Sequence, residues 1–150
     1  MSDVTYSQSR IERLSEIVSL NYSVFDGMYD RSPYNLEDYQ KKLKNVDPII
    51  YIAEQGGQII GDSIAFARDN NWYLWIFGVS KNHRRQGIAS NLFKLQEKYA
   101  KEKGYQKVTM KVYNVSKDML LVAIKRGYEI ADIEKKDGPE HNAIYLELVV

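Results

Sequence analysis

The chain has 150 residues, enough for a single hydrophobic core, and we expect one domain over residues 1–150. Its 21 Lys and Arg residues nearly balance its 20 Asp and Glu residues, so the net charge of +1 excludes a bulk field that would attract nucleic acid or an anionic membrane. The absence of cysteine excludes disulfides, thiolate metal sites and a cysteine nucleophile.

The sequence also lacks the usual signals for export and for metal binding. The N-terminal segment "MSDVTYSQSRIERLSE" has no hydrophobic signal core, and no apolar run approaches the length of a membrane span. The two histidines, His83 and His141, lie far apart, and no spacing typical of metal ligands surrounds them. We therefore expect a cytoplasmic protein without a metal.

The first 48 residues show helical patterns. Ser9 and Glu12 have the spacing of a capping box, which predicts a helix from about Arg10 to Phe25. Asn35 is a suitable cap for a second helix, which Pro48 ends. This part of the chain is therefore predicted to be helical throughout.

The pattern then changes to that of strands. "IIYIAE" and "QIIGDSIAFAR" predict two strands joined by a tight turn at Gly56–Gly57. The segment from Trp72 to Val79 is apolar on both faces apart from one tyrosine hydroxyl, which predicts a strand in the middle of the sheet with cover on both sides.

The second half alternates helices and strands. A helix is predicted from Gly87 to Gly104, the strand "KVTMKVY" follows, and a shorter helix runs from about Ser116 to Arg126. The segments "YEIADIE" and "AIYLELVV" predict two final strands. This order predicts an α+β or α/β fold with a mixed sheet. If "AIYLELVV" is an edge strand, it can pair with a second copy, so we expect a monomer or a homodimer.

The junction from Val79 to Ser90, "VSKNHRRQGIAS", carries the strongest functional signal. It joins an apolar strand to a helix through a basic turn (residues 80–87), and the first amides of that helix have no helical partner. These amides, the helix dipole and the missing side chain at Gly87 favour an anion such as a pyrophosphate. A solvated basic turn with a glycine for geometry is the alternative. His83, beside the arginines, is interpreted as a loop residue rather than a catalytic one.

Two segments resemble the GCN5-related N-acetyltransferase (GNAT) family. "RRQGIA" matches the family signature Q/R-x-x-G-x-G/A with Arg84, Gly87 and Ala89. "KGYQKVTMKVYNVSKDMLLVAIKRGYEI" is similar to the family's later strand, asparagine, short helix and Gly-aromatic pair. The resemblance extends from about Ile50 to the C-terminus. It implies a mixed, mostly antiparallel sheet of six to seven strands, flanked by about four helices, with splayed central strands.

The resemblance implies acetyl-CoA as co-substrate and no metal. Its pyrophosphate is expected on the amides around residues 85–90, and its pantetheine arm along the end of the central strand. The Val79 N–H is expected to donate to the thioester carbonyl. Asn114 is expected either to face the same cleft or to serve only in the turn. The implied cofactor-binding residues are Phe77, Gly78, Val79, Arg84, Arg85, Gln86, Gly87, Ile88, Ala89, Ser90 and Asn114.

The sequence departs from the family pattern at two catalytic positions. In many family members a carboxylate on the fourth strand acts as general base, but here that strand has no carboxylate. Asp62, Glu54 and Asp69 are the possible substitutes, each with a structural or solvated role as the alternative, and we favour Asp62. Ala123 stands where many relatives have a tyrosine as general acid. Tyr113 and Tyr128 lie nearby in sequence, but they fit packed strand ends at least as well.

The predicted function is N-acetyl transfer from acetyl-CoA to a primary amine of a small molecule or peptide, by direct attack in a ternary complex. The acceptor site is predicted in the loop "FDGMYDRSPYN" and the turn "KKDGPEHN", with Tyr29, Asp30 and Tyr34 holding a cationic amine. A catalytically silent acyl-CoA-binding module is the alternative. A nucleic-acid binder that uses Arg84 and Arg85 is disfavoured by the near-neutral charge.

Overall fold

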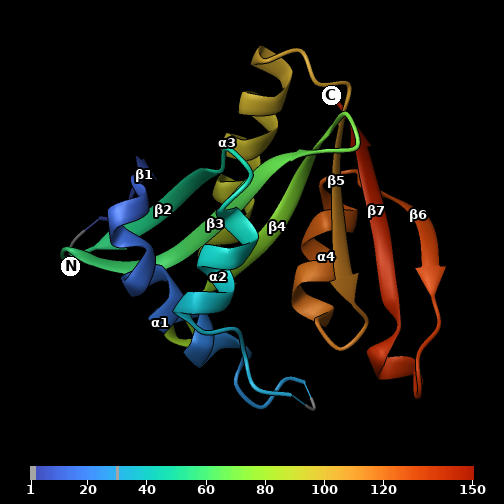
Figure 1. Cartoon of the computed structure of the whole chain (residues 1–150), viewed down its shortest axis with the longest axis horizontal. Helices are drawn as coiled ribbons and strands as arrows, with labels where there is room; N and C mark the ends of the chain where they lie inside the picture. Colours follow the sequence, from blue (N-terminus) through green and yellow to red (C-terminus); the bar gives the residue numbers. More distant parts are fainter. Residues whose placement is uncertain (1–2, 30) are drawn as a thin grey trace.

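The computed structural model describes residues 3–29 and 31–150. Within these residues one seven-stranded sheet has the order β1-β2-β3-β4-β5-β7-β6 (Figure 1). The strands are β1 (Thr5–Ser9), β2 (Ile49–Gln55), β3 (Gln58–Arg68), β4 (Asn71–Val79), β5 (Lys107–Tyr113), β6 (Glu129–Glu134) and β7 (Ala143–Val149). The helices are α1 (Leu14–Phe25), α2 (Leu36–Leu43), α3 (Ile88–Glu102) and α4 (Lys117–Lys125). The predicted fold class is confirmed.

All neighbouring strands are antiparallel except β4 and β5, which are parallel. The apolar strand β4 lies mid-sheet, as predicted. The suggestion that "AIYLELVV" has an unpaired edge is wrong, because β7 pairs with β5 on one side and with β6 on the other. The hairpin that follows β6 inserts β7 next to β5, which leaves β1 and β6 at the edges of the sheet.

The N-terminal segment differs from its prediction. Residues 5–9 form a strand on β2, with Ser9 opposite Ile50, followed by a short 3-10 turn before α1 begins at Leu14. The predicted capping box is wrong, since the Ser9 hydroxyl donates to the carbonyl of Arg10 and no side chain caps the turn. The strand forms because the free edge of β2 supplies hydrogen-bond partners. The polar sequence of residues 5–9 lacks the apolar alternation that would predict this strand. The cap at Asn35 is confirmed and is completed by Asp38.

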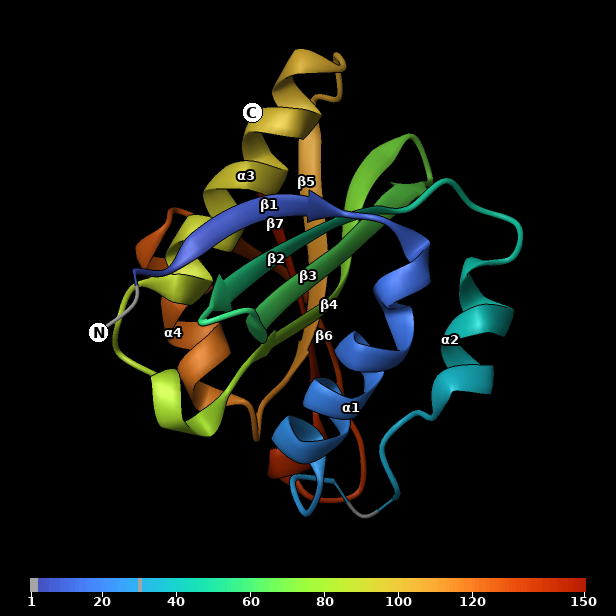
Figure 2. The same cartoon turned by 90° about the vertical axis from the view of Figure 1, so that its left-hand side faces the viewer.

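Helices cover both faces of the sheet (Figure 2): α1 and α2 lie on one side, α3 and α4 on the other. One core cluster joins the sheet to α3 through Leu92 and Phe93. The second joins it to α1 and α2 through Ile17 and Tyr39. Because each face is packed independently, the sheet serves as a rigid partition between two sides of the molecule.

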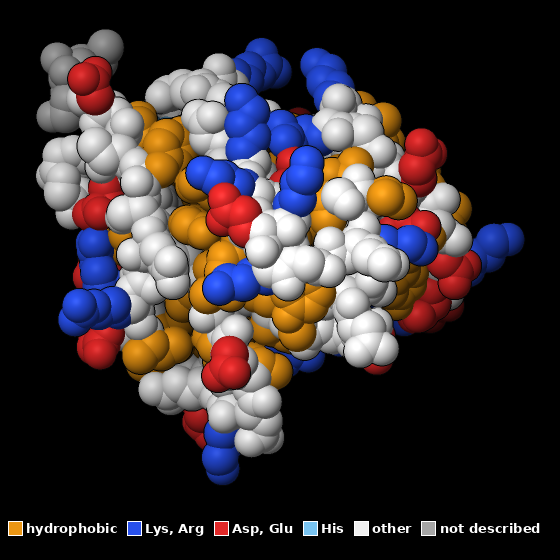
Figure 3. Space-filling view, turned by 90° about the horizontal axis from the view of Figure 1, so that it is seen from above, with side chains coloured by type: hydrophobic (Ala, Val, Ile, Leu, Met, Phe, Trp, Pro, Cys, Tyr) orange, Lys and Arg blue, Asp and Glu red, His pale blue; other side chains and the backbone are white. Residues whose placement is uncertain are grey.

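The surface carries charges of both signs. On the face seen in Figure 3, Lys and Arg side chains are interspersed with Asp and Glu, and hydrophobic side chains show between them. None of the helices in residues 3–29 and 31–150 combines the length and the apolar composition needed to cross a bilayer.

Candidate active site

A β-bulge opens the sheet between its two parallel strands. β4 pairs with β5 at only three positions, the last of which joins Leu74 to Met110. On the other side of β4, Ile64 pairs with Ile76 and Ala65 pairs with Leu74, so Trp75 is an extra residue in the strand. A bulge of this kind bends its strand and increases the local twist. β4 therefore diverges from β5 beyond Leu74 (Figure 1).

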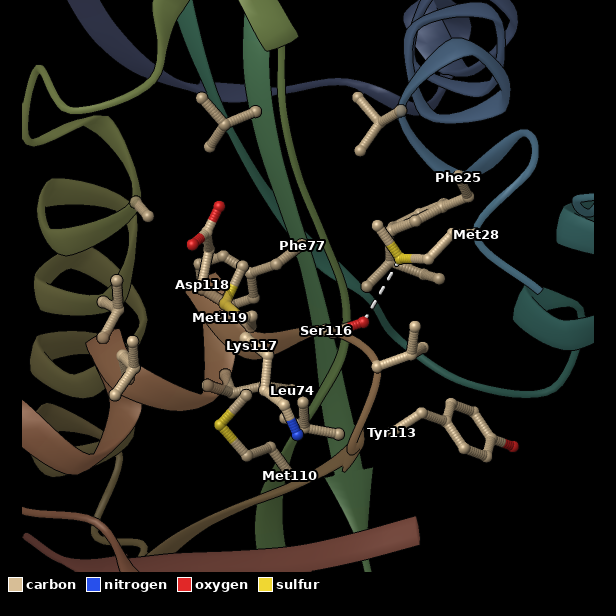
Figure 4. Close-up of a pocket in the computed structure, with 18 of the residues that line it drawn as sticks. Phe25, Met28, Leu74, Phe77, Met110, Tyr113, Ser116, Lys117, Asp118 and Met119 are labelled. Carbon is tan, nitrogen blue, oxygen red and sulfur yellow. Dashed lines mark hydrogen bonds between the residues drawn. The ribbon is translucent and has the colours of Figure 1, made fainter. Parts of the chain in front are cut away.

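The divergence creates a cleft with a volume of about 1070 Å³. It is lined by the segment between α1 and α2, by β4 and β5, by the basic turn and by the first turns of α3 and α4. Three of the four methionines of the chain, Met28, Met110 and Met119, line it from different elements (Figure 4). Methionine side chains adapt their shape easily, so this lining suits a long, partly apolar ligand.

The basic turn ends in a helix N-terminus with free amides. The first helical bond runs from the Asn91 N–H to the Gly87 carbonyl at 3.0 Å, which leaves the preceding N–H groups of α3 without helical acceptors. Arg85 and Gly87 both have positive φ, 62° and 77°, and such conformations turn successive amides toward one side. A Cβ added at Gly87 would meet no atom within 4 Å, so this surface is open to a ligand. The geometry suits an anion at the mouth of the cleft.

The end of β4 presents main-chain donors to the same cleft. The Ser80 N–H donates to the Ile60 carbonyl at 2.8 Å, on the β3 side. Because amides alternate along an extended strand, the N–H groups of Val79 and Phe77 point the other way, where β5 has diverged. A ligand lying along β4 can therefore bond to it as an added strand would.

Most of the predicted cofactor-binding residues line the cleft: Phe77, Val79, Arg84, Arg85, Gly87, Ile88, Ala89 and Ser90. Gln86 is exposed and Gly78 is buried, and neither is among the lining residues. The Asn114 side chain lies in the turn between β5 and α4, where it donates to the Pro139 carbonyl at 3.1 Å and accepts from Lys117. Asn114 does not line the cleft either. Its cofactor-binding role stays a prediction.

Asp62 lies on β3 in a buried polar cluster with Asn21 of α1 and Tyr39 of α2. It is fully buried, and its Oδ2 accepts a bond from Asn21 at 3.0 Å, while Asn21 also donates to the Tyr39 hydroxyl. The second carboxyl oxygen and the Asn21 carbonyl oxygen have no partner among the described atoms. Burial raises the pKa of Asp62 from 3.8 to about 8, although the Asn21 bond opposes the rise. Asp62 is not among the cleft-lining residues, so its role as base stays a prediction.

The other candidates for proton transfer lie outside the cleft, with the exception of Tyr113. Glu54 pairs with Arg13 at 3.1 Å, Asp69 is exposed in the β3–β4 turn, and neither lines the cleft. The Tyr128 hydroxyl donates to Glu97 at 3.0 Å, outside the cleft. Tyr113 does line the cleft.

The opposite side of the cleft is aromatic. Tyr29 and Tyr34 line it, and Asp30 lies outside the described residues; their role in holding an amine stays a prediction. The Tyr29 ring packs edge-on against Tyr113 at 5.4 Å, and its hydroxyl lies 3.2 Å from that of Ser116. Burial raises the pKa of Tyr29, so its hydroxyl keeps its proton.

Sequence reasoning missed three polar groups of the cleft. Lys111 and Arg31 both line it, as does His83, whose ring Nδ1 is buried without a partner in the described part of the chain. A signal existed for Lys111, because the alternation of "KVTMKVY" places it on the face opposite Met110 and Val112. No comparable pattern marked Arg31, which lies in an irregular segment. In residues 3–29 and 31–150 no group of three or more His, Cys, Asp or Glu side chains forms a metal site.

A sheet that opens between parallel central strands, with free amides and arginines at its mouth, defines a binding cleft for an elongated anionic ligand. Residues 11–127 match the family model described as the Acetyltransferase (GNAT) family. The chain therefore belongs to the GNAT acetyltransferase family, and the resemblance of its two motifs is confirmed.

Individual relatives are distant. N-acetyltransferase family 8 member 2 of Rattus norvegicus is 30% identical over 87 residues, which cover 54% of this chain and 38% of that protein. The match thus spans well under half of that relative's length. An N-acetyltransferase from Staphylococcus aureus Mu50 has a similar structure, with a TM-score of 0.80, 17% identity and 99% coverage of both chains. A GNAT family acetyltransferase from Elizabethkingia anophelis, solved with acetyl-CoA bound, gives a TM-score of 0.74 with 21% identity and 100% coverage of both chains.

Proposed function

We propose that the protein is an N-acetyltransferase that transfers the acetyl group of acetyl-CoA to a primary amine. The observation that carries this proposal is the cleft between β4 and β5, with main-chain donors along the end of β4 and a basic, glycine-containing turn at its mouth. The pyrophosphate would lie on the amides of residues 85–90, and the pantetheine arm would follow β4 past Phe77 to reach the region where the strands diverge.

The reaction we propose is direct attack within a ternary complex. The amine nitrogen attacks the thioester carbonyl carbon, a C–N bond forms, the C–S bond breaks and CoA leaves as a thiolate. Negative charge grows on the carbonyl oxygen during attack, and the Val79 N–H is the proposed donor that stabilises it. A thiol pKa near 8.5 makes the thiolate a fair leaving group without a tyrosine at the position of Ala123.

The amine must lose a proton before it attacks, because only about one part in 10³ of a lysine-like amine is neutral at pH 7. A base with a pKa of about 8 suits that step, which is why Asp62 remains the favoured candidate. Its burial requires that the proton reach it through a mobile group or a water rather than directly. If Asp62 is the base, Asp62→Asn should lower kcat by about 10²-fold or more at pH 7. A near wild-type kcat would leave it a structural role.

A silent acyl-CoA-binding module is the second candidate. It is favoured by one observation: among the described residues that line the cleft, Asp118 is the only acidic one, and it lies 3.6 Å from Arg84. Binding without transfer to any amine would support this alternative.

The first experiment is calorimetric titration with acetyl-CoA, dephospho-CoA and pantetheine. Binding of the first two and loss of affinity for pantetheine is the expected result, because only pantetheine lacks the pyrophosphate. Transfer is then followed by thiol release with a chromogenic disulfide, and the chain itself contributes no thiol because it has no cysteine. Equal affinity for pantetheine would refute the assignment of the basic turn.

A further inference from the structure

Two cations lie on the face of the cleft that remains for the acceptor. Lys111 is the first residue of β5 beyond the last pair with β4, so it lies where the strands begin to diverge. Its neighbours Met110 and Val112 pack on the side of α3 and α4, which places Lys111 on the side of α1 and α2. Arg31 lines the same cleft from the segment between these two helices.

Tyrosines connect the two cations. The Lys111 ammonium lies 5.0 Å from the centre of the Tyr113 ring, and the Arg31 guanidinium lies 6.0 Å from that of Tyr29. Tyr29 and Tyr113 pack against each other, so the cations stand on either side of one aromatic pair. Arg31 also lies 5.0 Å from the ring of Tyr34, which stacks on Trp75. We call Arg31, Lys111, Tyr29 and Tyr113 the cationic wall.

The cationic wall carries charge that the described protein does not neutralise. Within residues 3–29 and 31–150 neither Lys111 nor Arg31 forms an ion pair. Glu134 is near enough to Lys111 for their charges to interact, but it pairs with Lys136, accepts from the Tyr145 hydroxyl at 3.3 Å and does not line the cleft. Burial lowers the pKa of Lys111, yet the polar contact with Tyr113 and the surrounding tyrosines outweigh it and raise the pKa, so the ammonium stays charged.

Positive charge facing an acceptor site has a chemical consequence. A polycationic amine would be repelled there, whereas a carboxylate or phosphate would gain charge-assisted bonds from Lys111 and Arg31 in a partly dry site. We propose that the acceptor is a primary amine that also carries a carboxylate or phosphate, and that the cationic wall binds this anionic group. This inference rests on the proposed acetyl transfer.

The test compares matched acceptors that differ in one anionic group. L-phenylalanine is paired with L-phenylalaninamide, phosphoethanolamine with ethanolamine, and spermidine serves as the polycation. The anionic member of at least one pair should have a kcat/KM, calculated per unprotonated amine, about ten- to a hundredfold above that of the counterpart without the anion, and the two pairs distinguish carboxylate from phosphate. On the same scale, equal or better transfer to the counterparts without the anion or to spermidine would overturn the proposal.

Variants tie the preference to the cationic wall. Lys111→Met keeps most of the length of the side chain and removes its charge. The ratio of kcat/KM between the anionic acceptor and its counterpart should then fall to within about threefold of unity, mostly through KM. Lys103→Met is the matched control, because Lys103 also lies over a tyrosine ring, at 5.7 Å from Tyr99, but does not line the cleft. A preference that survives in Lys111→Met would overturn the assignment.

A binding measurement separates this inference from the proposed function. The same compounds are titrated into the CoA-saturated protein, and quenching of tryptophan fluorescence reports binding near Trp75. If the protein acetylates none of them, the proposed transfer lacks support, but Lys111-dependent binding of phenylalanine or phosphoethanolamine would still establish the anion site. Binding that is absent, or the same in Lys111→Met, would refute it.

Discussion

The Asp62→Asn variant should change how stability depends on pH. In the folded protein the carboxyl is fully buried with a pKa of about 8, whereas its ordinary value is 3.8. Between these values the folded state binds one more proton than the unfolded state, so the free energy of unfolding falls as pH rises. Each pKa unit corresponds to about 1.4 kcal/mol, so Asp62 alone should cost the wild type roughly 6 kcal/mol between pH 4 and pH 8.

An asparagine has nearly the same shape and does not ionise. Below about pH 4 the variant should match the wild type within about 2 kcal/mol, because the carboxyl is then largely protonated in both the folded and the unfolded state. Above pH 8 the variant should be the more stable protein by several kcal/mol, since the wild type then either buries a charge or opens the cluster.

Urea unfolding at pH 3.5 to 9, followed by the fluorescence of the two tryptophans, measures this difference. Asp69→Asn is the matched control, because this substitution makes the same chemical change at an exposed position, in the turn that follows β3. Parallel curves for wild type and Asp62→Asn would show that Asp62 ionises near its ordinary pKa, which would require water in the cluster.

Three further changes test other parts of the structure. Gly78→Ala should destabilise the protein by about 3 kcal/mol in urea unfolding, because the added Cβ would lie 2.0 Å from the Asn21 oxygen; an unchanged midpoint would mean that Asn21 can move away. Gly87→Glu should weaken acetyl-CoA binding at least a hundredfold in calorimetry through bulk and repulsion, whereas Gly104→Glu, also at positive φ with open space, should bind normally; equal affinities would contradict the pyrophosphate site. Gln96→Leu should cost about 3 kcal/mol, since it leaves Trp72 Nε1 and the Ser63 hydroxyl without their buried partner; thermal unfolding within 1 °C of wild type would contradict this.

The sequence predicted the features that depend on local chemistry. The cap at Asn35, the apolar mid-sheet strand and the glycine at the start of α3 follow from side-chain size, hydrogen-bonding capacity and backbone freedom, which are local properties of the residues concerned. The cleft was predicted from the family signature, because the spacing of Arg84, Gly87 and Ala89 can be recognised even when the rest of the sequence differs.

Long-range pairing decided the rest. A polar segment became β1 because β2 offered a free edge, and β7 became an interior strand because β6 folded outside it. Asn21, which is 41 residues from Asp62 in sequence, is its hydrogen-bond donor. Lys111 and Arg31 line one cleft only because the chain folds them to the same place. Residues so far apart in sequence produce no periodic pattern that would predict their proximity, because they interact only after the chain has folded. The sequence by itself therefore determined the class of the protein and the glycine turn before α3, whereas only the tertiary structure decided which charged side chains line the cleft together and how deeply Asp62 is buried.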